Sequence, residues 1–300
     1  MFYYLIFWPW FTGLVFLAMG IYSAAKEVPS ARGLDKVIVF GRVCAASALA
    51  AFGAEHMVNI RAFSPGVPSY IPFHAFWIAF VGLALLAAGL SLAWNRYTKL
   101  SCALLAVMLF SFVFMLHIPR LLANPHDRIS WAIVLRDSAF ASGFLAFAAS
   151  HAPRRQLLIL IGSLINAAAF LFYAPMHILH PQNAPGVPLE KLTPGWMPWP
   201  HVLATITALF LLAAAIAIVI NKYARVANAW LGAWMIYLTL VLYLPILLTS
   251  HGGLALIEGV NYVYDTLLFA GTILLLASAL PWNRTTTLKP APAPAVHATA

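Results

Sequence analysis

The stretch EHMVNIRAFSPGVPSYIPFH, residues 55–74, joins the end of one long apolar segment to the start of the next. About 120 residues later the chain contains a second loop of this kind, with His177, the run Pro185-Gly186-Val187-Pro188 and then His201. Both loops therefore carry the letters P-G-V-P between histidines. A loop repeated between two pairs of apolar segments predicts that the chain consists of two copies of one helical unit.

The composition indicates a protein that lies in a lipid bilayer. Hydrophobic residues make up 63% of the 300 residues and charged residues 8%, with a mean hydropathy of +0.89. Soluble domains are nearer to half apolar and a quarter charged. Inside a bilayer the chain itself must satisfy every backbone hydrogen bond, so we expect an all-α integral membrane protein.

The net charge of +9 would suggest nucleic acid as a partner of a soluble chain. Here the Lys and Arg residues occur in short connections between apolar runs, where they set membrane topology, and no nucleic-acid partner is expected. The two cysteines, Cys44 and Cys102, are far apart and form no C-x-x-C pair. A disulfide framework, a thiolate zinc site and a dithiol relay all lose support.

Nine apolar runs of about 20 residues are long enough to cross a bilayer as helices. They cover residues 3–24, 37–60, 74–95, 100–123, 131–151, 156–180, 201–221, 226–249 and 258–280. The first run lacks a basic leader and a small-residue cleavage site, so it is predicted to be a true span.

The repeat extends beyond the loops. Asn95-Arg96-Tyr97-Thr98-Lys99 aligns with Asn221-Lys222-Tyr223-Ala224-Arg225 at an offset of 126 residues. We therefore expect two parallel four-helix units after one separate helix. The expected parts are an N-terminal helix and linker (1–36), a first unit (37–151), a second unit (152–282) and a disordered Pro- and Ala-rich tail (283–300).

The distribution of Lys and Arg predicts the orientation. Eleven lie in the connections after the first, third, fifth, seventh and ninth spans, and four lie on the opposite side. The richer side is expected to be cytoplasmic. The amino terminus of this inner (plasma) membrane protein then faces out, the carboxyl terminus faces the cytoplasm, and both P-G-V-P loops lie outside.

Polar side chains within the spans are rare, and a charge near the bilayer centre costs on the order of 3 kcal/mol. The predicted cofactor-binding residues are His56, His74, His117, His177, His201, Arg136 and Asp137. They suggest a His/carboxylate cluster on the outer side for a quinone, a haem or a metal ion, because histidine ligates metals and can hydrogen-bond quinone carbonyls. Glu55, His56 and His117 are the candidate metal ligands. The alternative is that these residues cap helix ends and tie down the proline-rich loops.

Two further expectations concern pairing. Arg136 and Asp137 are adjacent and about 100° apart around a helix, so they are not assumed to pair. We expect Asp137 to pair with Arg120 on a neighbouring helix.

Several motifs resemble the DoxX-like family of membrane proteins. They are R-x-x-x-A-S-A-L-A-x-F-G-A-E-H from Arg42, the V-P-S-Y-I-P turn and the L-H-I-P-R run that contains His117. The resemblance implies a four-helix unit over about residues 37–150, and it is weaker over 156–280, where Tyr243 replaces the histidine. The family-type positions are Arg42, Gly53, His56, Val67, Pro68, Pro72, Gly82 and His117.

Members of that family are similar to a subunit of thiosulfate:quinone oxidoreductase and to membrane partners of redox-defence enzymes. The resemblance and the repeated histidines lead to the expectation of a membrane subunit of an electron-transfer or oxidoreductase assembly, with the lipid bilayer and membrane or periplasmic proteins as partners. One alternative is a non-catalytic scaffold or assembly subunit. Another is a carrier for a small molecule or lipid, although a parallel repeat counts against it.

Overall fold

The computed structural model describes residues 2–150 and 156–282, so the predicted disordered tail lies outside the described residues. The long helices are α1 (Phe2–Ala25), α3 (Phe40–Val58), α5 (His74–Ala93), α6 (Thr98–Phe112), α8 (Arg128–Ser150), α9 (Gln156–Leu179), α10 (Pro200–Val219), α11 (Ala224–Leu238) and α13 (Gly253–Ala279). The short ones are α2 (Asp35–Ile38), α4 (Ile60–Phe63), α7 (Ile118–Ala123) and α12 (Leu244–Leu248), with a 3-10 turn η1 (Ser64–Gly66) and π turns η2 (Val113–His117) and η3 (Thr239–Tyr243).

Helices account for the whole architecture of the described residues, which include no strand. Within residues 2–150 and 156–282, nine helical stretches are long and apolar enough to cross a membrane. The all-α class and the predicted number of such helices are therefore confirmed. The last stretch begins at Gly253 rather than at residue 258, because the helix continues through Glu258, whose exposed carboxylate lies 3.6 Å from Lys191 Nζ.

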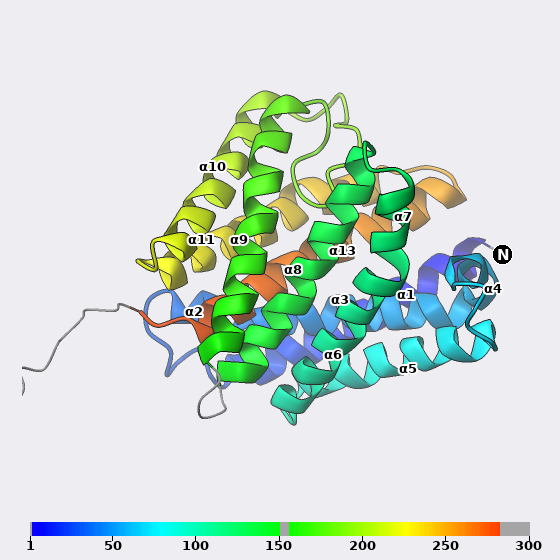
Figure 1. Ribbon diagram of the computed structural model, residues 1–300, viewed down its shortest axis with the longest axis horizontal. Coiled ribbons are helices and arrows are strands. Elements are labelled where there is room, and N and C mark those ends of the chain that lie inside the picture. The colour runs from blue at the N-terminus through cyan, green and yellow to red at the C-terminus, as the bar shows by residue number, and fades with distance from the viewer. Residues whose placement is uncertain (1, 151–155, 283–300) are drawn as a thin grey trace, which may run out of the picture.

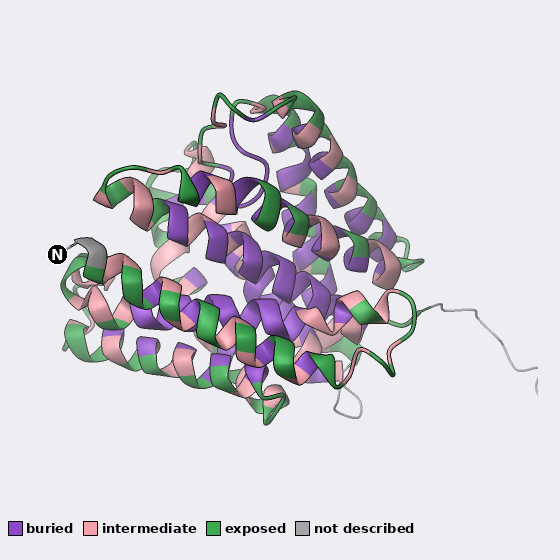
Figure 2. Ribbon diagram, turned by 180° about the vertical axis from the view of Figure 1, so that it is seen from behind, coloured by how far each residue is buried: buried purple, intermediate pink, exposed green. Residues whose placement is uncertain are grey.

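The long helices form two groups with α13 between them. Figure 1 shows α1, α3 and α5 along the longest axis of the molecule, with α9 and α10 at a steep angle to them. Helix α13 contacts α3, α8 and α11. Buried residues concentrate along these central helices, and the outer faces of α1, α5 and α10 are exposed (Figure 2).

Helix packing is reciprocal between the two expected units. In the first unit α3 packs on α5 and α6 on α8, and in the second α9 packs on α10 and α11 on α13. Across the units, the first helix of each packs on the last helix of the other, α3 on α13 and α9 on α8. The two last helices, α8 and α13, also contact each other at the centre.

Unusual backbone conformations recur at the same offset of 126 residues. Left-handed residues precede α5 and α10 at Phe73 (φ 58°) and Trp199 (φ 49°), and they precede α6 and α11 at Tyr97 (φ 58°) and Tyr223 (φ 59°). The π turns η2 and η3 have the same spacing. Positive φ is rare for aromatic residues, so its recurrence marks matching turns in the two halves.

Small residues allow the central helices to approach closely. An added Cβ at Gly271 of α13 would lie 2.6 Å from the main-chain nitrogen of Ala45 on α3, and one at Gly143 of α8 would lie 2.7 Å from the Thr272 carbonyl oxygen. The alanine- and serine-rich segments of α3 and α8 are buried. Small residues commonly have this packing role where helices cannot rely on the hydrophobic effect alone.

Two arginines, Arg42 and Arg225, cap the C-terminal ends of α5 and α13. The Arg42 guanidinium donates to the carbonyl oxygens of Leu92 and Ala93 at the end of α5, and it pairs with Glu27 at 2.7 Å. Arg225 does the same for the last carbonyls of α13 and pairs with Asp35. Cations are favourable at helix C-termini, and here both acidic partners come from the linker between α1 and α3.

Asp127 caps the start of α8. Its carboxylate accepts hydrogen bonds from the Ser130 hydroxyl at 2.6 Å and from the main-chain N–H groups of Ser130 and Ile129. These bonds, the hydroxyl bond above all, hold the pKa of Asp127 below its usual value. The cap fixes where α8 begins and thus the direction of the side chains in its next two turns.

The α3–α13 contact predicts the effect of Gly271→Ala. Alanine has the higher helix propensity by about 1 kcal/mol, but its Cβ would collide with the backbone of α3. We expect a net loss of about 1–3 kcal/mol in the free energy of unfolding, measured by denaturation in detergent. Gly195→Ala is the control, since its Cβ meets nothing within 4 Å. A Gly271→Ala protein as stable as the wild type would contradict this packing.

The Asp127 cap predicts a pH-dependent stability difference between the wild type and Asp127→Asn. The folded-state pKa of Asp127 lies below the unfolded value of about 3.9. The charged cap therefore stabilises the fold above that value, and its contribution disappears as the pH falls through the folded-state pKa. Unfolding measured from neutral to acidic pH should show the difference shrinking in this range. Exposed His126→Gln should leave the acid range unchanged.

Candidate functional site

The candidate site is a row of charged side chains that joins three helices. It lies toward the end of the molecule that carries the connections 59–73, 124–127, 180–199 and 249–252, which we call the loop end. The row consists of His117 at the end of η2, Asp137 and Arg136 in the third turn of α8, and Asp265 in α13. We call these four residues the ionic row.

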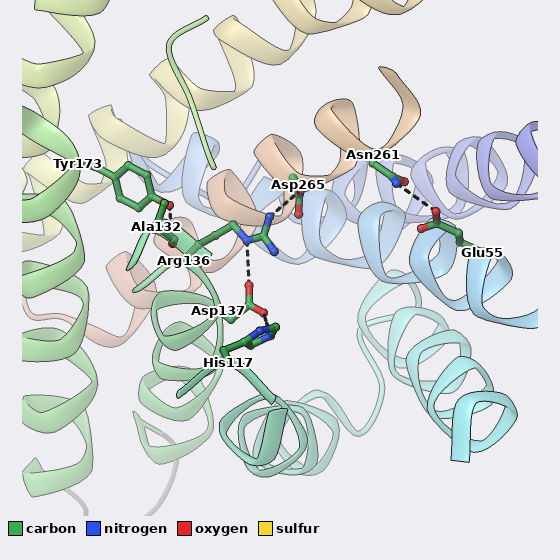
Figure 3. Close-up of polar contacts among 8 residues, drawn as sticks. All are labelled: Glu55, His117, Ala132, Arg136, Asp137, Tyr173, Asn261 and Asp265. Carbon is green, nitrogen blue, oxygen red and sulfur yellow. Dashed lines mark hydrogen bonds and ion pairs between the residues drawn. The ribbon is translucent and has the colours of Figure 1, made fainter. Parts of the chain in front are cut away.

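The ionic row is continuous (Figure 3). His117 Nε2 lies 2.9 Å from Asp137 Oδ2, and Arg136 Nε donates to Asp137 Oδ1 at 2.8 Å. The other side of the same guanidinium donates from Nη1 to Asp265 Oδ2 at 2.9 Å. Arg136 therefore bridges the carboxylates of α8 and α13, and Asp137 links this bridge to the imidazole.

The ionic row is largely buried and contains an excess of negative charge. The side chains of Arg136 and Asp265 are each 15% exposed, and that of His117 is the most open at 23%. One guanidinium faces two carboxylates, so the row has a charge of −1 when His117 is neutral. Uncompensated charge is costly in a low-dielectric interior, so each carboxylate depends on its contact with Arg136. His117, which contacts Asp137, is the most exposed member of the row.

Other polar groups face the row from neighbouring elements. Asn261 of α13, one turn before Asp265, donates to the buried carboxylate of Glu55 on α3 at 3.1 Å. Tyr173 of α9 donates to the carbonyl oxygen of Ala132 at 2.7 Å and lies within electrostatic range of Arg136. Four further groups are close enough to Asp265 or Arg136 to interact with them electrostatically: Glu55, Glu190, Tyr243 and Tyr262.

The expected pairing of Asp137 with Arg120 is wrong. Arg120 is exposed on α7, and Asp137 instead binds His117 and its own neighbour, Arg136. The reason is geometric: the long guanidinium bends back so that its Nε reaches the adjacent carboxylate, although the two side chains leave the helix in different directions. The π turn then brings His117, rather than a residue further along the chain, against α8.

His177 is buried and fully hydrogen-bonded within the chain. Its Nδ1 lies 2.7 Å from the Tyr173 carbonyl oxygen, and its Nε2 accepts a hydrogen bond from the Gly186 N–H at 3.0 Å. Gly186 belongs to the second P-G-V-P run, which is buried (Figure 2). This arrangement supports the alternative that histidine ties down a loop, and it leaves neither ring nitrogen available to a ligand.

The remaining predicted residues do not join one cluster. His56 Nδ1 lies 2.8 Å from the Phe52 carbonyl oxygen, and its ring lies 4.7 Å from that of Phe63. His74 and His201 lie at the starts of α5 and α10, half-buried and exposed respectively. All the predicted histidines lie toward the loop end, but among the described residues only His117 pairs with a carboxylate.

The structure does not assemble the candidate metal site. Glu55 binds Asn261, His117 binds Asp137, and His56 lies against Phe52 and Phe63. Across residues 2–150 and 156–282, no group of three or more His, Cys, Asp or Glu side chains is arranged to hold a metal ion. Glu55 and His56 are sequence neighbours on a helix and face different helices, which separates them.

The sequence marks Asp265 as a candidate polar residue within a span but does not place it among the predicted cofactor-binding residues, and it does not single out Asn261. A signal for Asp265 was present, since it lies within two residues of the position that matches Asp137 in the repeat. The direction of both side chains toward α8 and α3 could not be derived, because it depends on the reciprocal packing of α13. A pocket of about 150 Å³ lies elsewhere, between Trp196–Pro198 and the α11–η3 segment, and shares no residue with the ionic row.

The fold and site define an all-helical chain that is compatible with a multi-pass membrane protein and carries a buried ionic row. Residues 45–138 match a sequence family described as a domain of unknown function (DUF8561). No curated protein and no solved structure matches the chain. The matched segment contains α5 and α6, most of α3 and three of the four residues of the ionic row. Its description does not name the DoxX-like family, and that resemblance stays a prediction.

The shared guanidinium predicts strong coupling between Arg136 and Asp265. Arg136→Gln leaves two buried carboxylates without their cation, and we expect it to lower the free energy of unfolding by about 3–5 kcal/mol. Adding Asp265→Asn removes one unpaired carboxylate, so the double variant should lose much less than the sum of the single losses. A double-mutant cycle in detergent measures this.

The control cycle combines Arg136→Gln with Glu258→Gln, because the Glu258 carboxylate is half-exposed and bound to Lys191 instead. These two changes should be additive. Additivity of Arg136→Gln with Asp265→Asn would show that the bridge between α8 and α13 does not stabilise the protein.

Proposed function

We propose that this chain is a multi-pass protein of the inner (plasma) membrane, with its amino terminus outside and its carboxyl terminus in the cytoplasm. The nine apolar helices and the distribution of Lys and Arg support this placement. The recurring left-handed residues and π turns support two four-helix units of parallel orientation. In this orientation the loop end and the ionic row belong to the outer half of the bilayer.

Within that membrane, the protein is proposed to be a subunit of a quinone-linked electron-transfer assembly. Quinone reduction and quinol oxidation each move protons together with electrons, so a site for them needs a group that exchanges protons. The observation that carries the proposal is the ionic row, where two buried carboxylates share one guanidinium and one of them also contacts a partly exposed imidazole, a side-chain type that commonly moves protons. Ionisable groups inside spans commonly mark proton relays.

A quinone is favoured over a haem or a metal ion because of how the histidines are placed. His177 has both nitrogens engaged, and Glu55, His56 and His117 point to different partners. The choice of a quinone as the ligand rests on the resemblance of the sequence motifs to the DoxX-like family. Electrons are proposed to pass to or from a membrane or periplasmic partner protein.

A scaffold or assembly subunit is the second candidate. The observation that favours it is the burial of the second P-G-V-P run, with Ala184, Val187 and Leu189 almost inaccessible and Gly186 bound to His177. The buried run anchors the rest of this connection, so its exposed residues Glu190, Leu192 and Trp196 form a fixed surface at the outer side, as docking of a partner requires.

Binding of a short-chain quinone tests the leading proposal. The purified protein in detergent is extracted for isoprenoid quinones, and ubiquinone-1 and menadione are titrated against tryptophan fluorescence. We expect binding by the wild type and a loss of affinity of about tenfold in His117→Gln and Asp137→Asn, since a hydrogen bond to a charged group contributes about 1.5–3 kcal/mol. His201→Gln, at an exposed histidine outside the row, should bind normally.

Proton exchange is measured in the same samples. In weakly buffered solution, binding or chemical reduction of the quinone should change the proton count of the wild type, and Asp137→Asn should reduce that change. If no quinone co-purifies and neither probe binds, the quinone-linked proposal is wrong. Co-purification of a stoichiometric partner in that case would favour the scaffold.

A further inference from the structure

His56 and His177 have the same hydrogen bond to their own helices. In each, Nδ1 lies within 2.8 Å of the carbonyl oxygen four residues earlier, that of Phe52 or Tyr173. A carbonyl oxygen can only accept a hydrogen bond, so Nδ1 carries the proton in both rings. In a neutral ring the other nitrogen, Nε2, is then a bare acceptor.

In the second unit the chain itself fills this acceptor. The Gly186 N–H donates to His177 Nε2 at 3.0 Å, and Gly186 adopts a φ of 148°, which favours glycine. The loop is held by further bonds, from Tyr243 to the Ala184 carbonyl oxygen and from Arg128 to the Leu189 carbonyl oxygen. A Cβ on Gly186 would lie 2.5 Å from the Tyr243 hydroxyl, so the loop fits tightly.

In the first unit the same acceptor is left open. The loop with Pro65 and Gly66 is exposed, and an added Cβ on Gly66 would meet nothing within 4 Å. Among the hydrogen bonds of the described residues, His56 Nε2 has no partner, although the residue is half-buried, with its ring against that of Phe63 and its Cβ next to Gly82 of α5. The matching histidines of the two units thus differ at Nε2: that of His177 accepts a hydrogen bond from the chain, and that of His56 does not.

We propose that His56 Nε2 is the hydrogen-bond acceptor for a hydroxyl group of a quinol, and that the chain has one such site because the second unit closes its own with the Gly186 loop. The proposal rests on the proposed quinone-linked function and specifies the redox form and the contact residue. A quinol donates hydrogen bonds from two hydroxyl groups, whereas the oxidised quinone only accepts them. A bare imidazole nitrogen therefore binds the reduced form and not the oxidised one.

The neighbourhood of His56 suits a quinol. The Phe63 ring lies 4.7 Å from the imidazole and provides an apolar face on which a quinol ring can pack. Glu55, the preceding residue, points the other way to Asn261 of α13. A quinol bound at His56 would thus contact the residue next to Glu55, whose carboxylate binds Asn261 one turn before Asp265 of the ionic row.

The experiment compares the two redox forms of one molecule. Ubiquinol-1 and ubiquinone-1 are titrated against the full-length protein in detergent, for the wild type, His56→Phe, His56→Gln and His177→Gln. Phenylalanine keeps the ring and removes the acceptor, and glutamine can place an amide oxygen near the Nε2 position. The wild type should bind one ubiquinol-1 per chain.

We expect His56→Phe to weaken ubiquinol-1 binding about tenfold and to leave ubiquinone-1 binding unchanged, which a general loss of structure would not do. His56→Gln should restore part of the affinity, and His177→Gln should not remove the site. In the wild type, the ¹⁵N resonance of His56 Nε2 should shift when ubiquinol-1 is added and not when ubiquinone-1 is added. This second measurement needs no variant to fold.

The outcomes separate this inference from the proposed function. If the wild type binds both forms but His56→Phe changes neither or both equally, the role of His56 is wrong and the quinone-linked function stands. Two ubiquinol-1 molecules per chain, or displacement by lipid hydroxyl groups as effective as by ubiquinol-1, would also overturn it. If neither form binds to the wild type, the proposed function itself is overturned.

Discussion

The guanidinium of Arg136 holds together the two helices that all the others surround. It binds Asp137 on its own helix and Asp265 on α13, and α13 in turn contacts α3, α8 and α11. Arginine keeps its charge at every accessible pH, so a buried guanidinium requires carboxylates at fixed positions. Gly143 and Thr272 let the same two helices approach further along their contact. Close approach and charge pairing therefore define one arrangement of α8 against α13.

Local features of the structure could be predicted well from the sequence. Features that depend on which side of a helix a residue faces could be predicted less well. Helix number and extent follow from the length of apolar runs, and the packing role of small residues follows from their type. The predicted pairing of Asp137 with Arg120 was wrong. The π turn that ends at His117 inserts an extra residue into a helical turn and therefore rotates the residues after it. Pro119, which lacks an N–H group, indicates a disturbed helix there but not which side chain then faces α8.

The two P-G-V-P runs show that the structure of a loop, too, could not be predicted from its motif alone. Identical letters lead to an exposed turn at Pro65 and a buried segment at Pro185. The second run is held by contacts outside the motif, since Asn183 and Arg128 both donate to the Leu189 carbonyl oxygen. Those partners come from the longer second connection and from the last helix of the other unit, and no pattern within the motif indicates them.

Residues at matching positions in the two halves of the chain have different partners. His117 reaches a carboxylate, whereas Tyr243 at the end of the matching π turn donates to the main chain of the buried loop. His56 keeps an open nitrogen, whereas His177 has none. In both cases the residue in the second half of the chain binds the main chain of the buried loop, and its counterpart in the first half does not. Asp265 nevertheless completes the ionic row, so the second half of the chain contributes a buried carboxylate to it, while the matching His177 and Tyr243 hold the buried loop.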